Sequence, residues 1–314
     1  MTQKNMPRLL ITGASGLLGA NLVLDSHKEH DVIAVYHRHP IELEGVQSES
    51  ADLSQPGRAK ELFDRFQPEF VIHCAADTSI DELESNPELA FQMNREMAGN
   101  VAEAAKETGA KLVHISTDAV FDGRSGSYRE NDPTEPVNVY GKSKLAGEQA
   151  VQAVCPEALI IRTNIFGWNA QPKTSLAEWF LEQLEAGNTC PGLTDIDFSP
   201  LLVNDLGKLI LAMLSEVLSG VFHVPGADCI SKYDFGIYIA NLFGFDTDQI
   251  VPTVSDDVGF KALRPARTCL VGDKIEHSLG IQLPAIKDGL IRFRALCETG
   301  FSARLRGTIG GKGI

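Results

Sequence analysis

The sequence has no long apolar run free of charge and no C-x-x-C pair among its six cysteines. A membrane-spanning helix needs about 20 consecutive apolar residues, so no membrane partner is expected. The first predicted strand begins by Arg8, which leaves no room for a secretory signal peptide. The scattered cysteines are therefore expected to be reduced thiols of a cytoplasmic protein.

Positive charge is also scarce, because 28 Lys and Arg face 42 Asp and Glu, for a formal net charge of -14. Such a balance repels nucleic acid, so no nucleic-acid partner is expected. The eight histidines lack the spacing of metal ligands, and no metal site is predicted. A small anionic ligand stays possible, since a few local Lys or Arg can bind one. The oligomeric state is left open.

Short apolar segments alternate with helical patterns through the first half of the chain. Strands are predicted at 8–12, 32–36, 70–73, 111–115 and 159–162, and helices at 17–27, 56–66, 87–108 and from 139. This alternation favours a parallel sheet covered on both faces. With right-handed crossovers, the fold class is α/β, a Rossmann-like doubly wound parallel sheet.

The regular alternation weakens after about residue 166. Later elements are predicted as a helix near 204–219, a strand at 220–224 and a helix at 232–243. We expect a dinucleotide-binding domain over 1–165, with segments near 200–224 returning to it, a substrate-binding lobe over 166–300, and a flexible tail over 301–314.

A glycine-rich loop, G-x-x-G-x-x-G, lies between the first predicted strand and helix. Its glycines permit a tight turn, and the helix N-terminus offers free N–H groups to a pyrophosphate. The same spacing recurs at Gly307, Gly310 and Gly313 without a preceding strand. The position of the first loop, rather than its spacing, therefore predicts cofactor binding. The residues expected to bind there are Gly13, Ser15, Gly16, Leu17, Leu18 and Gly19.

The end of the second predicted strand bears on the choice of cofactor. An acid there would bind the ribose hydroxyls of NAD, but the stretch after Tyr36 contains no acid before Glu42. Arg38 could instead meet a 2′-phosphate, unless it is simply solvated. NADP(H) is therefore favoured, and NAD(H) remains possible.

Of the five tyrosines, only Tyr140 has a lysine four positions on, at Lys144. The two side chains would share one helical face. The ammonium is expected to lower the pKa of the phenol, which could then act as a general acid or base. Thr117 follows the fourth strand, where its hydroxyl could polarise a substrate carbonyl. The three residues are predicted to be catalytic, although a surface helix pair would give the same spacing.

With these motifs the chain resembles the extended short-chain dehydrogenases, and within them the dTDP-4-dehydrorhamnose reductase family. The resembling segments are 11–16, 73–78, 115–123, 139–148, 161–163 and 264–267. The resemblance implies an NAD(P)-dependent oxidoreductase with a small-molecule nucleotide-sugar substrate.

The resemblance also implies roles for individual residues. Gly16, Leu17 and Leu18 would line the pyrophosphate, and Asp52 and Leu53 the adenine. Ala75 and Ala76 would flank the nicotinamide, Thr117, Tyr140 and Lys144 would be catalytic, and Thr117 and Asp118 would face the sugar. If the substrate is a nucleotide-linked keto sugar, its diphosphate needs cationic partners, and Lys261, Arg264 and Arg267 are placed to supply them unless they form a solvated basic loop.

Three positions depart from the family pattern. Ala119 replaces a usual aromatic residue. Ile165 stands near the place of a tryptophan that contacts the nucleotide-sugar in rhamnose-forming members. Asn21 stands where some members have an acid that binds magnesium at a dimer interface. These departures affect the substrate and the dimer but leave the cofactor site intact.

Three functions remain open at this point. The first is reduction of a nucleotide-linked 4-keto sugar. The second is an NAD-dependent sugar-nucleotide epimerase or another carbonyl reductase, because the same triad serves those reactions. The third is non-catalytic, since the chain also resembles the NADP-binding regulatory beta subunit of methionine adenosyltransferase.

Overall fold

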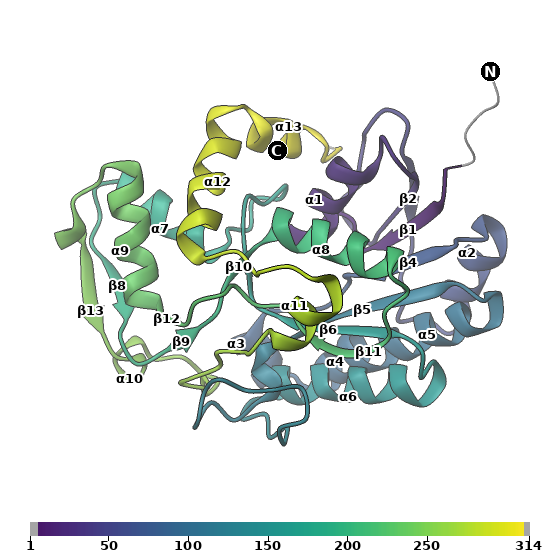
Figure 1. Ribbon diagram of the computed structural model, residues 1–314, viewed down its shortest axis with the longest axis horizontal. Helices are drawn as coiled ribbons and strands as arrows, with labels where there is room; N and C mark the ends of the chain where they lie inside the picture. The colour runs from purple at the N-terminus through teal and green to yellow at the C-terminus, as the bar shows by residue number, and fades with distance from the viewer. Residues whose placement is uncertain (1–5, 311–314) are drawn as a thin grey trace.

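The computed structural model describes residues 6–310, and its centre is a sheet of seven parallel strands in the order β11-β6-β5-β4-β1-β2-β3 (Figure 1). The strands are β1 Arg8–Thr12, β2 Asp31–Tyr36, β3 Gln47–Ser50, β4 Phe70–His73, β5 Lys111–Thr117, β6 Leu159–Thr163 and β11 Gly220–His223. Every neighbouring pair is parallel. The Rossmann-like prediction is therefore confirmed.

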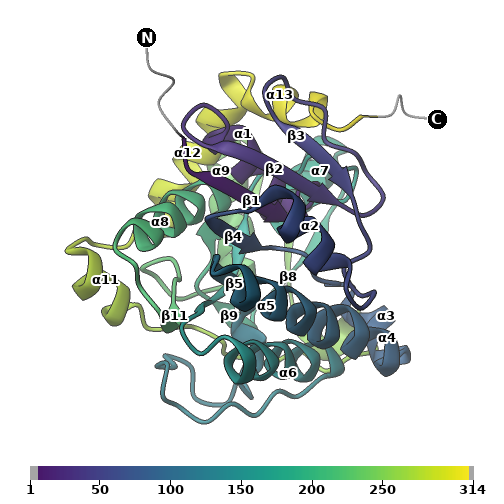
Figure 2. The same cartoon turned by 90° about the vertical axis from the view of Figure 1, so that its right-hand side faces the viewer.

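Helices cover both faces of the sheet (Figure 2). Along β1, Leu9 and Ile11 pack into one hydrophobic core and Leu10 into another, because successive strand residues point to opposite faces. The first core includes α1 Leu17–Ser26 and α8 Val203–Ser215. The helices of the second core are α2 Arg58–Phe66, α5 Met97–Thr108 and α6 Val139–Val154.

The predicted helix over 87–108 forms in three parts. They are α4 Pro87–Phe91, a π-helical turn η1 Gln92–Glu96 and α5. Within the turn, Asn94 accepts from the backbone N–H of Asp77 at 2.9 Å and donates to the Ser143 hydroxyl at 3.0 Å. Since π-turns concentrate at functional sites, this one is notable for tying the segment after β4 to α6. The short α3, Ile80–Ser85, precedes it.

The second half of the chain builds a smaller lobe beside the carboxyl ends of the strands, with α7, α9, β8 and β13 at its far side (Figure 1). Its strands are paired two by two. The elements are β7 Ile165–Phe166, α7 Leu176–Glu185, β8 Cys190–Leu193, β9 Asp197–Phe198, β10 Leu201–Leu202, β12 Ile230–Ser231, α9 Lys232–Phe243, β13 Ile250–Thr253, α10 Ser255–Val258, α11 Asp273–Leu279 and α12 Ile286–Glu298. Where one domain ends and the other begins stays a prediction.

The expectation of a flexible tail is wrong for residues 301–310. Helix α13, Phe301–Gly307, buries Phe301 and Leu305, which lie one turn apart on the same face. Ile309 then forms a bridge with Ile41. The apolar pair anchors the segment to the domain core. Residues 311–314, including Gly313, lie outside the described residues.

The expectation that every cysteine is a free thiol is also wrong. Cys229 and Cys269 form a disulfide across 40 positions of sequence. Folding brings together two thiols that the sequence separates, so their spacing could not reveal the pair. Cys74, Cys155, Cys190 and Cys297 are free. Between residues 6 and 310, no helix has the length and apolar character to cross a membrane, and no three His, Cys, Asp or Glu side chains are grouped to hold a metal ion.

Candidate functional site

The glycine-rich loop leaves no room for side chains at two of its glycines. Gly13 has φ +62, and a Cβ there would lie 2.7 Å from the backbone of Ala75. A Cβ on Gly19 would overlap the carbonyl oxygen of Gly13 and lie 2.8 Å from Cα of Ala14. The loop therefore packs tightly onto the end of β4 and the first turn of α1. Helix α1 therefore begins directly at this loop, with Gly16 as its N-cap.

One cavity of about 500 Å³, here called the cofactor cavity, opens between this loop, the ends of β4 and β5, and the start of α6. It brings together seven of the predicted site residues, namely Gly16, Leu17, Leu18, Ala76, Thr117, Tyr140 and Lys144. Ala75 and Gly13 lie directly behind this surface, in contact with each other. Residues from four separate parts of the sequence thus line one cavity.

Lys144 lies deep in the cofactor cavity and is almost fully buried. Its ammonium donates to the carbonyl oxygen of Ile115 at 2.7 Å, which fixes it against β5. Burial lowers its pKa to about 8, although the negative charge of Glu148, one turn further along α6, acts to raise it. The ammonium is therefore mostly charged at neutral pH, and it loses its proton as the pH rises through about 8.

Tyr140 behaves differently from the sequence prediction. Burial, with smaller contributions from Asp118 and Asp77, raises its pKa to about 12, while the nearby hydroxyl of Thr117 opposes the shift. The expected lowering of this pKa by Lys144 is absent, and the ammonium donates to the Ile115 carbonyl instead. The phenol is therefore neutral at physiological pH, which suits a proton donor.

Asp118 is fully occupied by neighbouring side chains. It accepts from the Thr117 hydroxyl at 3.0 Å, from Asn164 Nδ2 at 2.9 Å and from the Thr268 hydroxyl at 2.7 Å. Burial raises its pKa. This carboxyl thus connects Thr117 to the smaller lobe through Thr268. It does not line the cofactor cavity.

A buried ion pair fixes the rear of the site. Arg162 at the end of β6 donates three hydrogen bonds to Glu148 of α6, the shortest at 2.7 Å, and both side chains are nearly fully buried. Glu148 also accepts from the Ser116 hydroxyl at 2.5 Å. These contacts tie α6, which carries Tyr140 and Lys144, to β5 and β6 next to Thr117.

No sequence pattern predicted the role of the loop over 167–175, which lines the cofactor cavity. Its residues Asn169, Gln171, Lys173, Thr174 and Ser175 line that cavity. Gln171 Nε2 donates to the Ser15 carbonyl at 2.7 Å, and Lys173 Nζ donates to the Thr78 hydroxyl at 3.1 Å. The loop therefore connects the glycine-rich loop with the segment that follows β4. No motif marks these residues, because only folding places them there.

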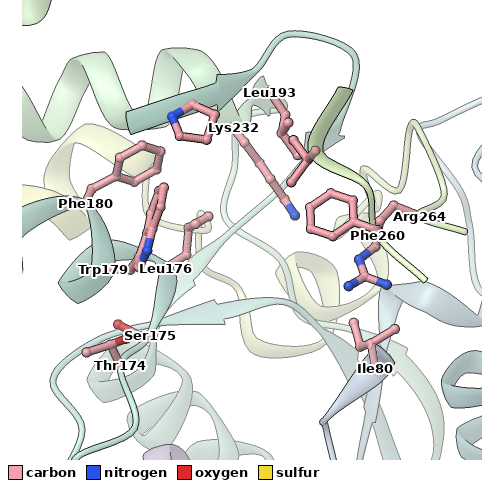
Figure 3. Close-up of a pocket in the computed structure, with 12 residues that line it drawn as sticks. Ile80, Thr174, Ser175, Leu176, Trp179, Phe180, Leu193, Lys232, Phe260 and Arg264 are labelled. Carbon is pink, nitrogen blue, oxygen red and sulfur yellow. The ribbon is translucent and has the colours of Figure 1, made fainter. Parts of the chain in front are cut away.

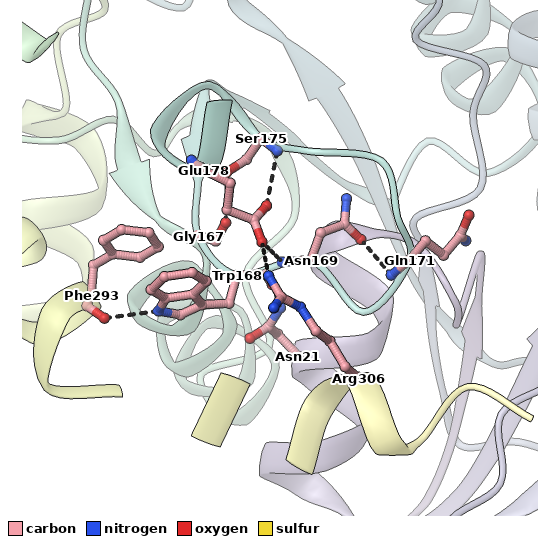
Figure 4. A network of polar contacts seen from close by, with 9 residues as sticks. All are labelled: Asn21, Gly167, Trp168, Asn169, Gln171, Ser175, Glu178, Phe293 and Arg306. Carbon is pink, nitrogen blue, oxygen red and sulfur yellow. Dashed lines mark hydrogen bonds and ion pairs between the residues drawn. The ribbon is translucent and has the colours of Figure 1, made fainter. Parts of the chain in front are cut away.

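The carboxylate of Glu178 holds this loop in place (Figure 4). It accepts from the backbone N–H groups of Asn169 at 3.0 Å and Ser175 at 2.9 Å, and from Arg306 of α13 at 3.3 Å. Ser175 also caps α7 in a capping box with Glu178. The loop is therefore fixed by α7 and by the C-terminal helix.

A second cavity of about 610 Å³, here called the lobe cavity, adjoins the first, since Thr174 and Ser175 line both. Lys232 points into it from the start of α9, opposite the ring of Trp179 (Figure 3). Its other lining residues include Phe260 and Arg264. The lobe cavity combines aromatic rings with cations, beside the cavity that holds the predicted catalytic residues.

Several predicted residues lie away from both cavities. Arg38 is exposed after β2, and Arg267 and Lys261 are exposed around Arg264. Leu53 is buried in the core. Asp52 accepts from the backbone and hydroxyl of Ser54, which lowers its pKa. Of the three predicted diphosphate cations, Arg264 is the one that reaches a cavity.

The three departures from the family pattern have local explanations. Asn21 is buried, and its Nδ2 donates to the carbonyls of Leu17 and Trp168 at 2.8 and 2.9 Å, so it joins α1 to the 167–175 loop. Ile165 lines the cofactor cavity. Ala119 packs against Tyr140 in a small apolar cluster.

A doubly wound sheet whose phosphate loop shares one cavity with Tyr140, Lys144 and Thr117 defines an NAD(P)-dependent oxidoreductase of the extended short-chain type. The chain belongs to the RmlD substrate binding domain family, which matches residues 7–297. The predicted family is therefore confirmed.

Individual relatives agree with this assignment. The chain is 35% identical over 291 residues to the probable low-salt glycan biosynthesis reductase Agl14 of Haloferax volcanii, covering 91% of this chain and 96% of that protein. It is 31% identical to methionine adenosyltransferase 2 subunit beta of Danio rerio, with 91% of each covered. The structure of dTDP-4-dehydrorhamnose reductase from Bacillus anthracis in complex with NADP superposes with a TM-score of 0.84 at 28% identity, covering 92% of this chain and 99% of that one.

Proposed function

We propose that this protein is an NADPH-dependent reductase of a nucleotide-linked 4-keto sugar. The observation that carries the proposal is the meeting of Tyr140, Lys144 and Thr117 with the phosphate loop in one cavity. The adjoining lobe cavity, with its aromatic and cationic lining, has room for the nucleotide end of such a substrate. A sugar at the junction would place its carbonyl beside the phenol.

The cofactor proposed is NADP(H), with NAD(H) as the alternative. The residues fit a dinucleotide, since Gly13 and Gly19 are held free of side chains where the pyrophosphate would approach. Arg38 is exposed at the carboxyl end of β2, with no ion-pair partner among residues 6–310, and would meet a 2′-phosphate. The superposed Bacillus anthracis reductase was solved with NADP.

The mechanism uses a neutral phenol. When bound, NADPH supplies the hydride for the carbonyl carbon. Tyr140 donates its proton to the carbonyl oxygen, so the ketone gains one hydride and one proton and becomes an alcohol. Thr117 orients that oxygen by a hydrogen bond, and Lys144 would hold the nicotinamide ribose. With its pKa raised to about 12, the phenol of Tyr140 is protonated near neutral pH, so the proton is in place before the reduction.

Replacement of Tyr140 tests the reaction. With NADPH and a dTDP-linked 4-keto sugar, we expect Tyr140→Phe to lower kcat by about 100-fold or more, since general acid catalysis contributes about 10²–10⁴-fold. NADPH binding, measured by fluorescence, should be retained. Tyr238→Phe on α9, which lines neither cavity, is the control and should keep wild-type activity. A fully active Tyr140→Phe would rule out the mechanism.

Two alternatives have distinct signatures. An epimerase would retain NAD through purification, which a spectrum of the protein reveals. The likeness to methionine adenosyltransferase 2 subunit beta favours a regulatory role as the second candidate. Co-purification of a stoichiometric synthetase, together with no NADPH consumption on any nucleotide-linked keto sugar, would favour that regulator over the reductase.

A further inference from the structure

Lys232 places an ammonium group in the lobe cavity without a bonding partner. It is the first residue of α9, and its side chain extends toward Phe260 and Arg264 (Figure 3). Among residues 6–310 no hydrogen bond or ion pair involves its Nζ, and the ring of Phe198 lies 6.0 Å away. The charge is therefore available to a ligand.

This position is unfavourable for a cation. The N-terminus of α9 carries partial positive charge, and burial, together with the nearby Arg264, lowers the pKa of Lys232. Asp118 and Asp195 favour the charged form, but both are engaged elsewhere, Asp118 with Thr268 and Asp195 with Ser255. A cation kept where the fold disfavours it is typical of a functional residue.

Arg264 cannot replace Lys232 in this role. Its guanidinium donates to Asp81 at 2.8 Å and to the Ala262 carbonyl at 3.1 Å, and it lies 4.4 Å from the centre of the Phe260 ring. The carboxylate of Asp81 balances its charge and fixes its position. Lys232 therefore supplies the uncompensated positive charge of the lobe cavity, while Arg264 offers directed N–H groups beside it.

We propose that Lys232 binds the diphosphate of the nucleotide-linked substrate and thereby selects for it. The inference rests on the proposed function for the sugar, but the diphosphate site is testable without any sugar. A diphosphate on Lys232 would lie in a cavity that is also lined by Trp179 and Phe260 and by the shared residues Thr174 and Ser175. The sugar end of the substrate would then reach the cofactor cavity.

Calorimetric titration of the full chain with dTDP, UDP, GDP and thymidine tests this site. We expect Lys232→Met to weaken nucleoside diphosphate binding by about 10- to 100-fold, the usual loss for a charged hydrogen bond. Thymidine, which lacks phosphate, should be unaffected. Lys232→Arg should recover most of the affinity because it restores the charge.

Lys106→Met is the matched control, since Lys106 is exposed on α5 outside the cavity, and it should bind diphosphates as the wild type does. Unchanged NADP+ binding by Lys232→Met would show that the variant is folded. The inference is overturned if that variant binds diphosphates normally, or if the wild type binds none of the three.

The two proposals can fail separately. If dTDP binding depends on Lys232 but no 4-keto sugar is reduced, the diphosphate site stands and the proposed reaction falls. If the wild type and Lys232→Met reduce the sugar with equal KM, the reaction stands and the role of Lys232 falls.

Discussion

At the residue scale, Tyr140 and Lys144 show how burial changes the chemistry that their spacing predicts. The spacing implied a phenol with a lowered pKa, but burial raises that pKa to about 12 and lowers that of Lys144 to about 8. Both shifts have the same cause, since a buried group resists its charged form. Near neutral pH the phenol of Tyr140 therefore carries its proton, and Lys144 is mostly charged.

These pKa values predict the pH dependence of reduction. Lys144 loses its proton as pH rises through about 8, whereas Tyr140 keeps its proton to about 12. We therefore expect kcat/KM for NADPH to be level near neutrality and to fall above about pH 8, with one ionisation. Steady-state rates at low NADPH concentration measure this profile, because kcat/KM reports the ionising groups of the enzyme before NADPH binds.

Lys144→Arg provides the control for this assignment, because a guanidinium stays charged across the same range. Its rates will be lower, since the bond to the Ile115 carbonyl changes, but the fall above about pH 8 should disappear. A fall that persists in this variant would assign the ionisation to another group.

At the element scale, the join between β1 and α1 determines cofactor binding. The first turn of α1 packs so closely on the loop that a Cβ at Gly19 would overlap the Gly13 carbonyl. The sequence predicted this join correctly, because strand, glycine spacing and helix are contiguous. It also gave β4 its observed bounds and placed the start of α6 at Val139.

Gly19→Ala should therefore disrupt the loop. We expect a loss of NADPH affinity, measured by fluorescence titration, and a destabilisation of about 1–3 kcal/mol from overpacking. Gly99→Ala on α5 is the matched control, since its Cβ would lie 3.8 Å from that of Ala150. That change should leave binding intact and be neutral or stabilising by up to about 1 kcal/mol. Equal effects of the two variants would contradict the packing argument.

At the scale of the whole molecule, contacts between segments far apart in the sequence position the residues around the two cavities. Thr268 reaches Asp118 and hence Thr117, and Arg306 of α13 reaches Glu178 beneath the 167–175 loop. The disulfide from Cys229 fixes Cys269, the neighbour of Thr268. Thr117, the predicted catalytic threonine, is therefore linked to segments about 100 or more residues further along the chain.

Removal of the disulfide should lower global stability. Closing a loop of 40 residues is worth about 4 kcal/mol in the chain-entropy treatment. We expect the double variant Cys229→Ser, Cys269→Ser to unfold at lower denaturant concentration than the wild type. Reductant should destabilise the wild type, where Cys229 is exposed, and leave the double variant unchanged. Identical unfolding of both proteins without reductant would contradict a stabilising role.

The sequence by itself determined the sheet, the phosphate loop and the Tyr140–Lys144 pair, because each depends on residues close together along the chain. The tertiary structure alone decided the partners of Asp118, the 167–175 loop, the disulfide and the cavity that Lys232 faces. Those features join segments that no local pattern relates, since side-chain burial and long-range contact exist only once the chain is folded. The protonation state of Tyr140 also depends on the tertiary structure, because the sequence supplies the phenol but its burial in the folded protein raises the pKa.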